Sequence, residues 1–275
     1  MRIEFVKMQG LGNDFFVFDA PAADFHPSKE RLRAIADRRT GVGFDQALLL
    51  GQPRDAESRT FYRIFNSDGS EVEQCGNGAR CIASLLYARA PHLGRDLKMG
   101  STGGMINAHV GDDGLVSVDM GVPNFDPRAL PMDAISEADL YTLNVDGTDF
   151  EFGAVSMGNP HVVLQVADVK TAPLEQIGPS IERHPRFSRR TNVGFMQILT
   201  RNHLRLRVYE RGAGETLACG TGACAAVAVG RRRGLLDAEV EVELPGGTAK
   251  VCAAADASLW LTGPATTVFT GSIDI

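Results

Sequence analysis

The feature that most constrains the fold is a sequence that repeats parts of itself about half a chain apart. Self-similarity of this kind indicates repeated structural units with the same fold. Three short segments recur in the same order, each at a separation close to half of the 275 residues. We therefore expect two similarly folded halves related by a pseudo-twofold axis. The recurring pairs are Gly12-Asn13 with Gly158-Asn159, Val42–Leu48 with Val193–Leu199, and Cys75–Ala79 with Cys219–Ala223.

A proline-rich segment separates the two expected halves. Three prolines lie between Gly121 and Pro131, and a residue without a backbone N–H interrupts a strand ladder. A second break lies at Gly263-Pro264, and the segment that follows is too short to form a domain. We predict that this last segment returns to the first half as a strand. The predicted halves are residues 1–120 plus 264–275, and residues 121–263.

Apolar patterns along the chain favour many short strands and few helices. Alternation of polar and apolar residues is typical of half-buried strands, whereas apolar residues three and four apart are typical of helices. The mixture predicts an α+β chain with mostly antiparallel sheets. The expected strands are Arg2–Met8, Phe16–Phe18, Phe61–Phe65, Val162–Val166, Leu204–Glu210, Glu239–Leu244 and Leu259–Leu261, and the expected helices are Lys29–Arg39, Gly78–Arg89, Leu174–Arg183 and Gly222–Arg233.

Composition narrows the class of protein. Hydrophobic residues make up 44% of the chain and charged residues 23%, which is typical of a globular protein with its own core. The net charge of −6 argues against a nucleic-acid surface, where clustered cations would neutralise phosphates. The N-terminal residues contain no apolar stretch long enough for a signal peptide or a membrane span. We therefore expect a cytoplasmic protein that contacts neither nucleic acid nor membrane.

The chain has five scattered cysteines, an odd number that cannot pair fully. In a reducing compartment each thiol is either a small buried residue or a reactive group. Cys81, Cys224 and Cys252 lie in apolar patterns that favour the core. Cys75 and Cys219 differ, because each precedes a glycine-rich helix start. Their spacing to the other cysteines does not match a Cys-x-x-Cys zinc site, so we expect no bound metal.

The two Cys-Gly-x-Gly-Ala motifs together form the predicted catalytic site. The positive end of a helix dipole favours a thiolate, and the exposed N–H groups of a helix start bind a carboxylate. Two symmetric halves would place Cys75 and Cys219 on opposite sides of a cleft, facing the two sides of one α-carbon. One thiolate would remove the α-proton and the opposing thiol would return a proton, which inverts the centre. Because none of the five lysines lies in a motif typical of a Schiff base, we expect an amino-acid epimerase without a cofactor.

Segment Asn66–Arg80 closely resembles the signature of the diaminopimelate epimerase family. Gly10–Phe15, Gly158–His161, Tyr209–Gly212 and Ala218–Gly222 fit the same family, so the resemblance covers nearly the full chain. It implies two similar α/β halves, each a sheet wrapped round a central helix, with the site in the cleft. It also implies conversion of LL-2,6-diaminopimelate to the meso form in lysine and cell-wall precursor biosynthesis. The family works without a cofactor and usually as a homodimer.

The resemblance also implies roles for individual residues. It makes Cys75 and Cys219 the catalytic thiols, and it gives His161 and Glu210 the role of tuning them. Phe269 corresponds to an aromatic dimer contact found in some relatives. Arg211 suits a distal carboxylate, because a guanidinium donates two parallel hydrogen bonds, and Glu210 suits a distal ammonium. The residues that match substrate contacts are Asn13, Gln46, Asn66, Gly76, Asn77, Asn159, Asn192, Glu210, Arg211, Gly220 and Thr221.

Two other functions stay open on the sequence alone. A proline or hydroxyproline racemase of the same fold would also use two thiols. Such enzymes usually carry histidine after Cys-Gly, where this chain has Asn77, and the Glu210-Arg211 pair favours a longer substrate with a second charged end. A thiol redox or ligand-binding protein could use the same two cysteines, which would then oxidise to a disulfide. That second alternative does not explain the amide, glutamate and arginine side chains around the motifs.

Overall fold

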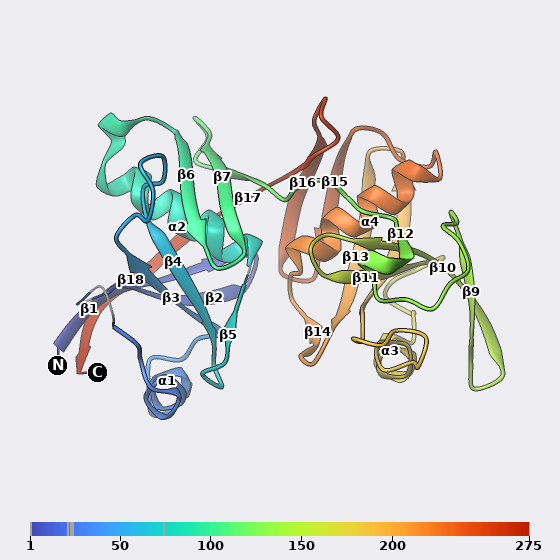
Figure 1. Ribbon diagram of the computed structural model, residues 1–275, viewed down its shortest axis with the longest axis horizontal. Helices are drawn as coiled ribbons and strands as arrows, with labels where there is room; N and C mark the ends of the chain where they lie inside the picture. The colour runs from blue at the N-terminus through green and yellow to red at the C-terminus, as the bar shows by residue number, and fades with distance from the viewer. Residues whose placement is uncertain (1, 21, 23–24, 74, 275) are drawn as a thin grey trace. The chain divides into compact units, whose positions relative to one another are not determined.

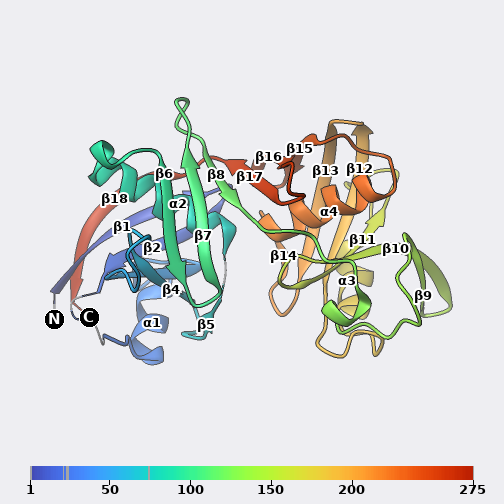
Figure 2. The same ribbon diagram turned by 45° about the horizontal axis from the view of Figure 1, so that its top comes forward.

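The computed structural model describes residues 2–20, 22, 25–73 and 75–274. The chain divides into two compact units, the first made of Met1–Asp119 with Thr262–Ile275 and the second of Met120–Leu261. Each unit holds a mixed sheet, one helix inside the curve of the sheet and one helix outside it (Figures 1 and 2). Within the described residues, no helix is long and apolar enough to cross a membrane.

The sheet of the first unit is mostly antiparallel. Its strands lie in the order β18–β1–β2–β3–β4–β6–β7–β8, with the short β5 also paired to β4. Only the β2–β3 and β4–β6 pairs among these are parallel. The unit contains β1 (Arg2–Gly10), β2 (Asn13–Asp19), α1 (Lys29–Ala36), β3 (Gln46–Gly51), β4 (Phe61–Asn66), β5 (Glu71–Val72), α2 (Gly76–Arg89), β6 (Asp96–Ser101), β7 (Gly104–Val110), β8 (Val116–Asp119) and β18 (Thr266–Asp274), and β17 (Leu259–Gly263) enters it from the second unit.

The sheet of the second unit repeats this pattern. Its strands lie in the order β9–β10–β11–β12–β13–β15–β16, with the short β14 also paired to β13. Here β11–β12 and β13–β15 are the parallel pairs. The unit contains β9 (Tyr141–Val145), β10 (Thr148–Ser156), β11 (Pro160–Gln165), α3 (Leu174–Glu182), β12 (Asn192–Thr200), β13 (His203–Glu210), β14 (Gly214–Thr216), α4 (Gly220–Arg232), β15 (Glu239–Leu244) and β16 (Gly247–Ala253).

Helices α2 and α4 are the central helices of their units. Helix α2 contacts β1, β2, β7 and β8, and α4 contacts β10, β11, β12, β13 and β16. A helix that is apolar on most sides is stable only when strands surround it. Ala79–Ala83 of α2 and Ala223–Val227 of α4 are fully buried. Small side chains let the strands approach α4 closely, since a Cβ on Gly153 of β10 would lie 2.3 Å from Val229.

Helices α1 and α3 cover the opposite faces of the two sheets. Leu32 and Ile35 of α1 pack into a cluster with Phe5 of β1, Phe16 and Phe18 of β2, Ala47 and Leu49 of β3, and Phe65 of β4. Leu174 and Ile181 of α3 pack on β9–β12. The expected α+β fold of two pseudo-symmetric halves, each a mostly antiparallel sheet round a central helix, is confirmed. The C-terminal segment also returns as expected, because β18 runs antiparallel to β1.

Strand register shows which residues of the two units are equivalent. Phe15 pairs with Gln46 in the parallel β2–β3 ladder, and His161 pairs with Asn192 in the parallel β11–β12 ladder. The echo of Val42–Leu48 in Val193–Leu199 is therefore wrong as a structural match. It would align Gln46 with Gln197, which lies further along β12 opposite Arg205. Short apolar strand segments look alike at several offsets, and only the hydrogen-bonded ladder selects one. The equivalent positions are Asn13 and Asn159, Gln46 and Asn192, Asn66 and Glu210, and Cys75 and Cys219.

Candidate functional site

Each predicted catalytic cysteine lies immediately before a central helix. Cys75 is the N-cap residue of α2 and Cys219 the N-cap residue of α4, both in extended backbone conformation. Neither side chain makes a capping hydrogen bond to its helix. The first N–H groups of a helix have no carbonyl partner within it and carry the positive end of its dipole. Each unit therefore combines a thiol with an anion-binding helix start.

The second glycine of each motif allows the helix start to pack against the sheet. A Cβ on Gly222 would lie 2.9 Å from Val208 of β13 and 3.3 Å from the Cys219 sulfur. A Cβ on Gly78 would lie 3.2 Å from Leu48 of β3. Side chains at these positions would push the helix away or displace the thiol. This close approach is the physical reason for the Cys-Gly-x-Gly spacing.

The thiol of Cys75 lies next to an amide side chain. Its Sγ lies 3.7 Å from Oδ1 of Asn13, and Nδ2 of Asn77 donates to the same oxygen at 3.3 Å. The amides of the two neighbouring strands pair with each other instead, because Gln46 donates to Oδ1 of Asn66 at 3.0 Å. Asn13 and Asn77 thus gather at the thiol, while Gln46 and Asn66 form a separate pair.

Cys219 has a carboxylate partner in place of an amide. Its Sγ donates to Oε2 of Glu210 at 2.9 Å, and Thr216 donates to the other carboxylate oxygen at 2.6 Å. Burial raises the pKa of the Cys219 thiol well above its ordinary value, and the charge and hydrogen bond of Glu210 raise it further. Cys219 is therefore a neutral thiol at neutral pH. Oγ1 of Thr221, on the first turn of α4, lies 3.6 Å from the same sulfur.

His161 and Asn159 form a short chain that ends at Thr221. Nε2 of His161 lies 3.0 Å from Oδ1 of Asn159, whose Nδ2 donates to Oγ1 of Thr221 at 3.3 Å. His161 is only 1% exposed. Burial, together with the charge of Arg211, lowers the pKa of His161 to about 3. A neutral imidazole that donates from Nε2 is the form that satisfies the Asn159 oxygen.

The buried, neutral His161 should make the protein less stable in mild acid. The pKa of histidine is near 6.5 in the unfolded chain, whereas that of His161 in the folded protein is about 3. Between these values the unfolded chain binds a proton that the folded protein does not bind. Stability from this group is therefore complete above about pH 6.5 and falls as the pH drops. Between pH 7 and 5 we expect the wild type to lose about 2 kcal/mol more unfolding free energy than His161→Asn, which cannot titrate. Urea unfolding at both pH values measures the difference, and equal losses in the two proteins would contradict it.

Asn192 and Arg211 lie together at the ends of β12 and β13. Oδ1 of Asn192 accepts the backbone N–H of Arg211 at 2.9 Å, and its Nδ2 donates to the carbonyl of Pro160 at 3.0 Å. Nη1 of Arg211 donates to the carbonyl of Arg189 at 3.1 Å, and this arginine is exposed. The guanidinium is thus held by one backbone contact and faces solvent. Phe269, the predicted dimer contact, belongs to the first unit instead. It lies on β18, and its ring is 5.9 Å from that of Phe5.

Sequence reasoning missed Glu182, which supports this arginine. Glu182 is 1% exposed at the end of α3, and its carboxylate accepts the N–H of Gly212 at 3.2 Å. It also pairs with Arg183 at 3.0 Å and Arg190 at 3.5 Å. The carboxylate therefore joins the turn after β13 to the segment before β12. An acidic residue at a helix C-terminus is unfavourable for the helix alone, which was the available signal.

The described residues contain no group of three or more His, Cys, Asp or Glu side chains arranged to hold a metal ion. All five cysteines lie in the described residues and are thiols. A thiol next to hydrogen-bonding amides or a carboxylate is able to take up and release a proton.

Comparison with known proteins identifies the family. The family model for diaminopimelate epimerase matches residues 5–125 and 153–268. A diaminopimelate epimerase from Alkalilimnicola ehrlichii is 54% identical over 99% of both chains, and one from Thioalkalivibrio sulfidiphilus is 54% identical over the full length of both. The chain belongs to the diaminopimelate epimerase family. It is accordingly an isomerase.

Solved structures of more distant proteins share the fold of this family member. A hydroxyproline epimerase from Agrobacterium vitis has a TM-score of 0.70 at 15% identity, covering 99% of this chain and 92% of the other. A phenazine biosynthesis protein of the PhzF family from Bacillus anthracis has a TM-score of 0.66 at 17% identity, with both chains fully covered. At these identities the likeness concerns the fold alone.

Proposed function

We propose that this chain is a cofactor-independent diaminopimelate epimerase that interconverts LL-2,6-diaminopimelate and meso-2,6-diaminopimelate. The observation that carries the proposal is the pair of equivalent cysteines, each at the start of a central helix, in a chain of this family. The reaction serves lysine and cell-wall precursor biosynthesis, and the cytoplasm is the expected location. In this proposal each half of the chain contributes one catalytic thiol. Residues 1–120 plus 264–275 form the half that carries Cys75, and residues 121–263 form the half that carries Cys219.

Proton transfer at the α-carbon needs one thiolate and one thiol on opposite faces of the substrate. In one direction the Cys75 thiolate takes the α-proton, the electron pair moves onto the α-carbon, and Cys219 gives its proton to the other face. The neutral state of Cys219, hydrogen-bonded to Glu210, supports its role as the acid. After one turnover the two sulfurs have exchanged protonation states, and the reverse direction uses them in the opposite roles.

The two helix starts are the proposed site for the α-carboxylate. Backbone N–H groups of Gly76 and Asn77, and of Gly220 and Thr221, would stabilise the negative charge that grows on the carboxylate as the proton leaves. Metal ions and cofactors have no role in this proposal.

Polar side chains beside the thiols would recognise the substrate and its distal end. Arg211 is exposed and can hold the distal carboxylate with two parallel hydrogen bonds. Both oxygens of Glu210 are engaged by Thr216 and Cys219, which supports thiol tuning as its main role. His161 is the second tuning residue in this proposal. The amides proposed for substrate contact are Asn13, Gln46, Asn66, Asn159 and Asn192.

We also propose that the protein is a homodimer that uses β18. This strand exposes Val268 (56%) and Phe269 (46%), and the ring of Phe269 makes an edge contact with that of Phe5. Two neighbouring apolar side chains on a strand surface are a suitable contact for a second copy.

Deuterium incorporation tests the function. LL-diaminopimelate is incubated with the enzyme in D2O, and proline is incubated separately under the same conditions. We expect meso-diaminopimelate that carries one deuterium at the inverted α-carbon, and unlabelled proline. Label in proline alone would leave two-thiol chemistry intact but reject the substrate. No label in either compound would reject the epimerase and favour a ligand-binding or thiol redox role.

A further inference from the structure

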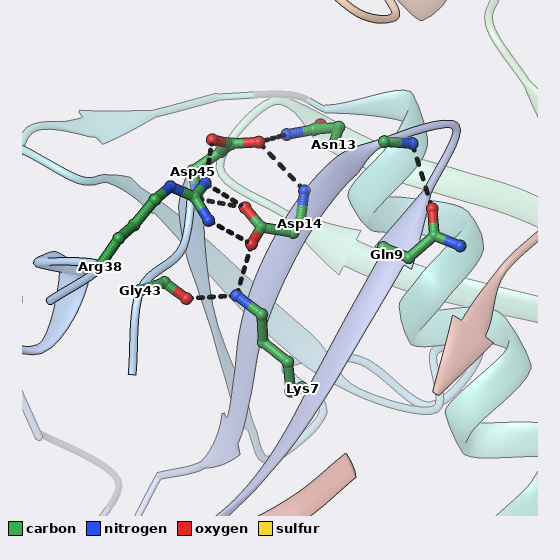
Figure 3. A network of polar contacts seen from close by, with 8 residues as sticks. Lys7, Gln9, Asn13, Asp14, Arg38, Gly43 and Asp45 are labelled. Carbon is green, nitrogen blue, oxygen red and sulfur yellow. Dashed lines mark hydrogen bonds and ion pairs between the residues drawn. The ribbon is translucent and has the colours of Figure 1, made fainter. Parts of the chain in front are cut away.

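Asn13 contacts both Cys75 and a charged cluster of Asp45, Asp14, Arg38 and Lys7. Figure 3 shows Asn13 with this cluster. Nδ2 of Asn13 donates to Oδ2 of Asp45 at 3.0 Å. Its Oδ1 faces Sγ of Cys75 at 3.7 Å and accepts from Asn77 at 3.3 Å. A carboxylate can only accept hydrogen bonds, so the NH2 group of the amide must face Asp45. Because the amide is planar, its oxygen is then directed to the thiol.

The Asp45 carboxylate is itself held on both oxygens. The backbone N–H of Asp14 donates to Oδ2 at 3.1 Å, and Nη2 of Arg38 donates to Oδ1 at 2.8 Å. The backbone N–H of Asp45 in turn donates to Oδ1 of Asp14 at 2.8 Å. These reciprocal contacts tie the start of β2 to the residue that precedes β3. Asp45 therefore cannot turn away from Asn13 without breaking several other bonds.

Two cations keep the cluster charged. Arg38 binds both oxygens of Asp14 at 2.8 Å, and the buried Lys7 binds Asp14 at 2.6 Å and the carbonyl of Gly43 (Figure 3). Burial alone would raise the pKa of Asp14, but the hydrogen bonds from Arg38 and Lys7 hold it well below its ordinary value. Asp14 therefore stays charged beside Asp45 at neutral pH.

The equivalent amide in the second unit has the opposite orientation. Asn159 directs its NH2 group to Thr221 on the first turn of α4, whereas Asn13 directs its oxygen to Asn77 on the first turn of α2. The difference follows from the partner behind each amide. His161 donates to Asn159, while Asp45 accepts from Asn13.

We infer that Asp45 is a positioning residue of the epimerase, whose carboxylate holds the Asn13 amide with its oxygen toward Cys75. The inference rests on the proposed function, because it concerns how one catalytic thiol is prepared. An acceptor beside the sulfur favours the protonated thiol and keeps the thiolate strongly basic. A strong base is what removal of an α-proton requires.

The variant Asp45→Asn tests this role. Its new NH2 group can donate to Oδ1 of Asn13, so the Asn13 amide can turn and present its NH2 group to Cys75. We expect the pH midpoint for alkylation of Cys75 by iodoacetamide, followed by mass spectrometry, to fall by about one unit. We also expect kcat to fall by about tenfold, with KM changed less. Asp45→Glu keeps an acceptor and should stay close to the wild-type midpoint.

Two comparisons separate positioning from a general loss of charge. Asp19→Asn removes one negative charge from the same unit at an exposed ion pair with Arg89, and it should leave the midpoint unchanged. Asn13→Ala removes the amide through which Asp45 acts, so adding Asp45→Asn to it should cause no further shift. The other groups near this thiol are the same in every variant. They include Arg80, which donates to Asn77, and Tyr62 and Cys81, whose charged forms interact with that of Cys75.

A midpoint in Asp45→Asn equal to that of Asp19→Asn would overturn the inference. So would a shift that persists in the Asn13→Ala background. Alkylation needs no substrate, so this result is independent of the deuterium experiment. A shifted midpoint without epimerisation would keep the positioning role of Asp45 and reject the proposed function.

Discussion

Replacing either Cys75 or Cys219 with serine should reduce epimerisation by about 10²–10⁴-fold in both directions, the range expected for loss of a positioned acid or base. A hydroxyl fits where a thiol was, but it does not ionise near neutral pH and is a poor base. In the proposed reaction the two sulfurs act on opposite faces of the α-carbon, so neither would replace the other. Initial rates of meso-diaminopimelate formation from the LL isomer, and of the reverse reaction, measure the effect.

A third cysteine provides the matched control. Cys252 lies on β16, and its thiol contacts Glu239 at 3.5 Å. It belongs to neither of the two Cys-Gly-x-Gly-Ala motifs. Cys252→Ser should keep wild-type activity. A similar loss in this variant would point to a general effect of cysteine removal. If Cys75→Ser or Cys219→Ser kept more than about a tenth of the activity, that cysteine would not be an acid or base in the reaction.

Replacing Glu210 with glutamine should lower the pKa of Cys219, because the carboxylate is one of the groups that raise it. Burial also raises this pKa and is unchanged in the variant, so the value should fall only part of the way. In the direction that needs Cys219 as the acid, the thiol would lose its proton at a lower pH. The alkaline limb of the pH–rate profile should therefore move to lower pH. At pH 8 the thiol stays mainly protonated in both proteins, so we expect the loss of rate on the alkaline limb, about tenfold for each unit by which the pKa falls.

The alkylation midpoint of Cys219 and the pH–rate profile provide two readings of the Glu210 effect. Glu215→Gln is the matched control, because Glu215 lies on the adjacent β14 and pairs with Arg207 at 2.6 Å instead of with a thiol. That variant should keep both the midpoint and the profile. An unchanged Cys219 midpoint in Glu210→Gln would mean that the 2.9 Å contact does not control the protonation of the thiol.

The local parts of the candidate site were predictable from the sequence. Glycine spacing after Cys75 and Cys219 predicted two helix starts, and these are α2 and α4. Apolar periodicity predicted the surrounding strands. Both signals depend on neighbouring residues along the chain, where backbone conformation and side-chain spacing are directly coupled. The catalytic and binding roles given to these residues stay predictions until the variants are measured.

Register was less accessible, and one repeated segment led to a wrong match. Val42–Leu48 and Val193–Leu199 look similar, but β3 and β12 pair with their neighbours at a different offset. The correct offset aligns Asn66 with Glu210, an amide with a carboxylate. The hydrogen bonds also differ between the two units, because Cys75 contacts Asn13 whereas Cys219 contacts Glu210. The symmetric motif did not suggest this difference.

The sequence by itself determined the two-half α+β plan, the two thiols at helix starts and the polar residue types near them, because these follow from short-range periodicity and turn chemistry. Three contacts were decided only by the tertiary structure. Asp45 accepts a hydrogen bond from the Asn13 amide, Glu182 accepts one from the backbone of Gly212 next to Arg211, and Glu210 accepts one from the Cys219 thiol. Asp45 and Asn13 are 32 residues apart and Glu182 and Gly212 are 30 apart. Such contacts form only when strand pairing and burial bring distant backbone together, and the direction of each hydrogen bond is then set by which partner can only accept.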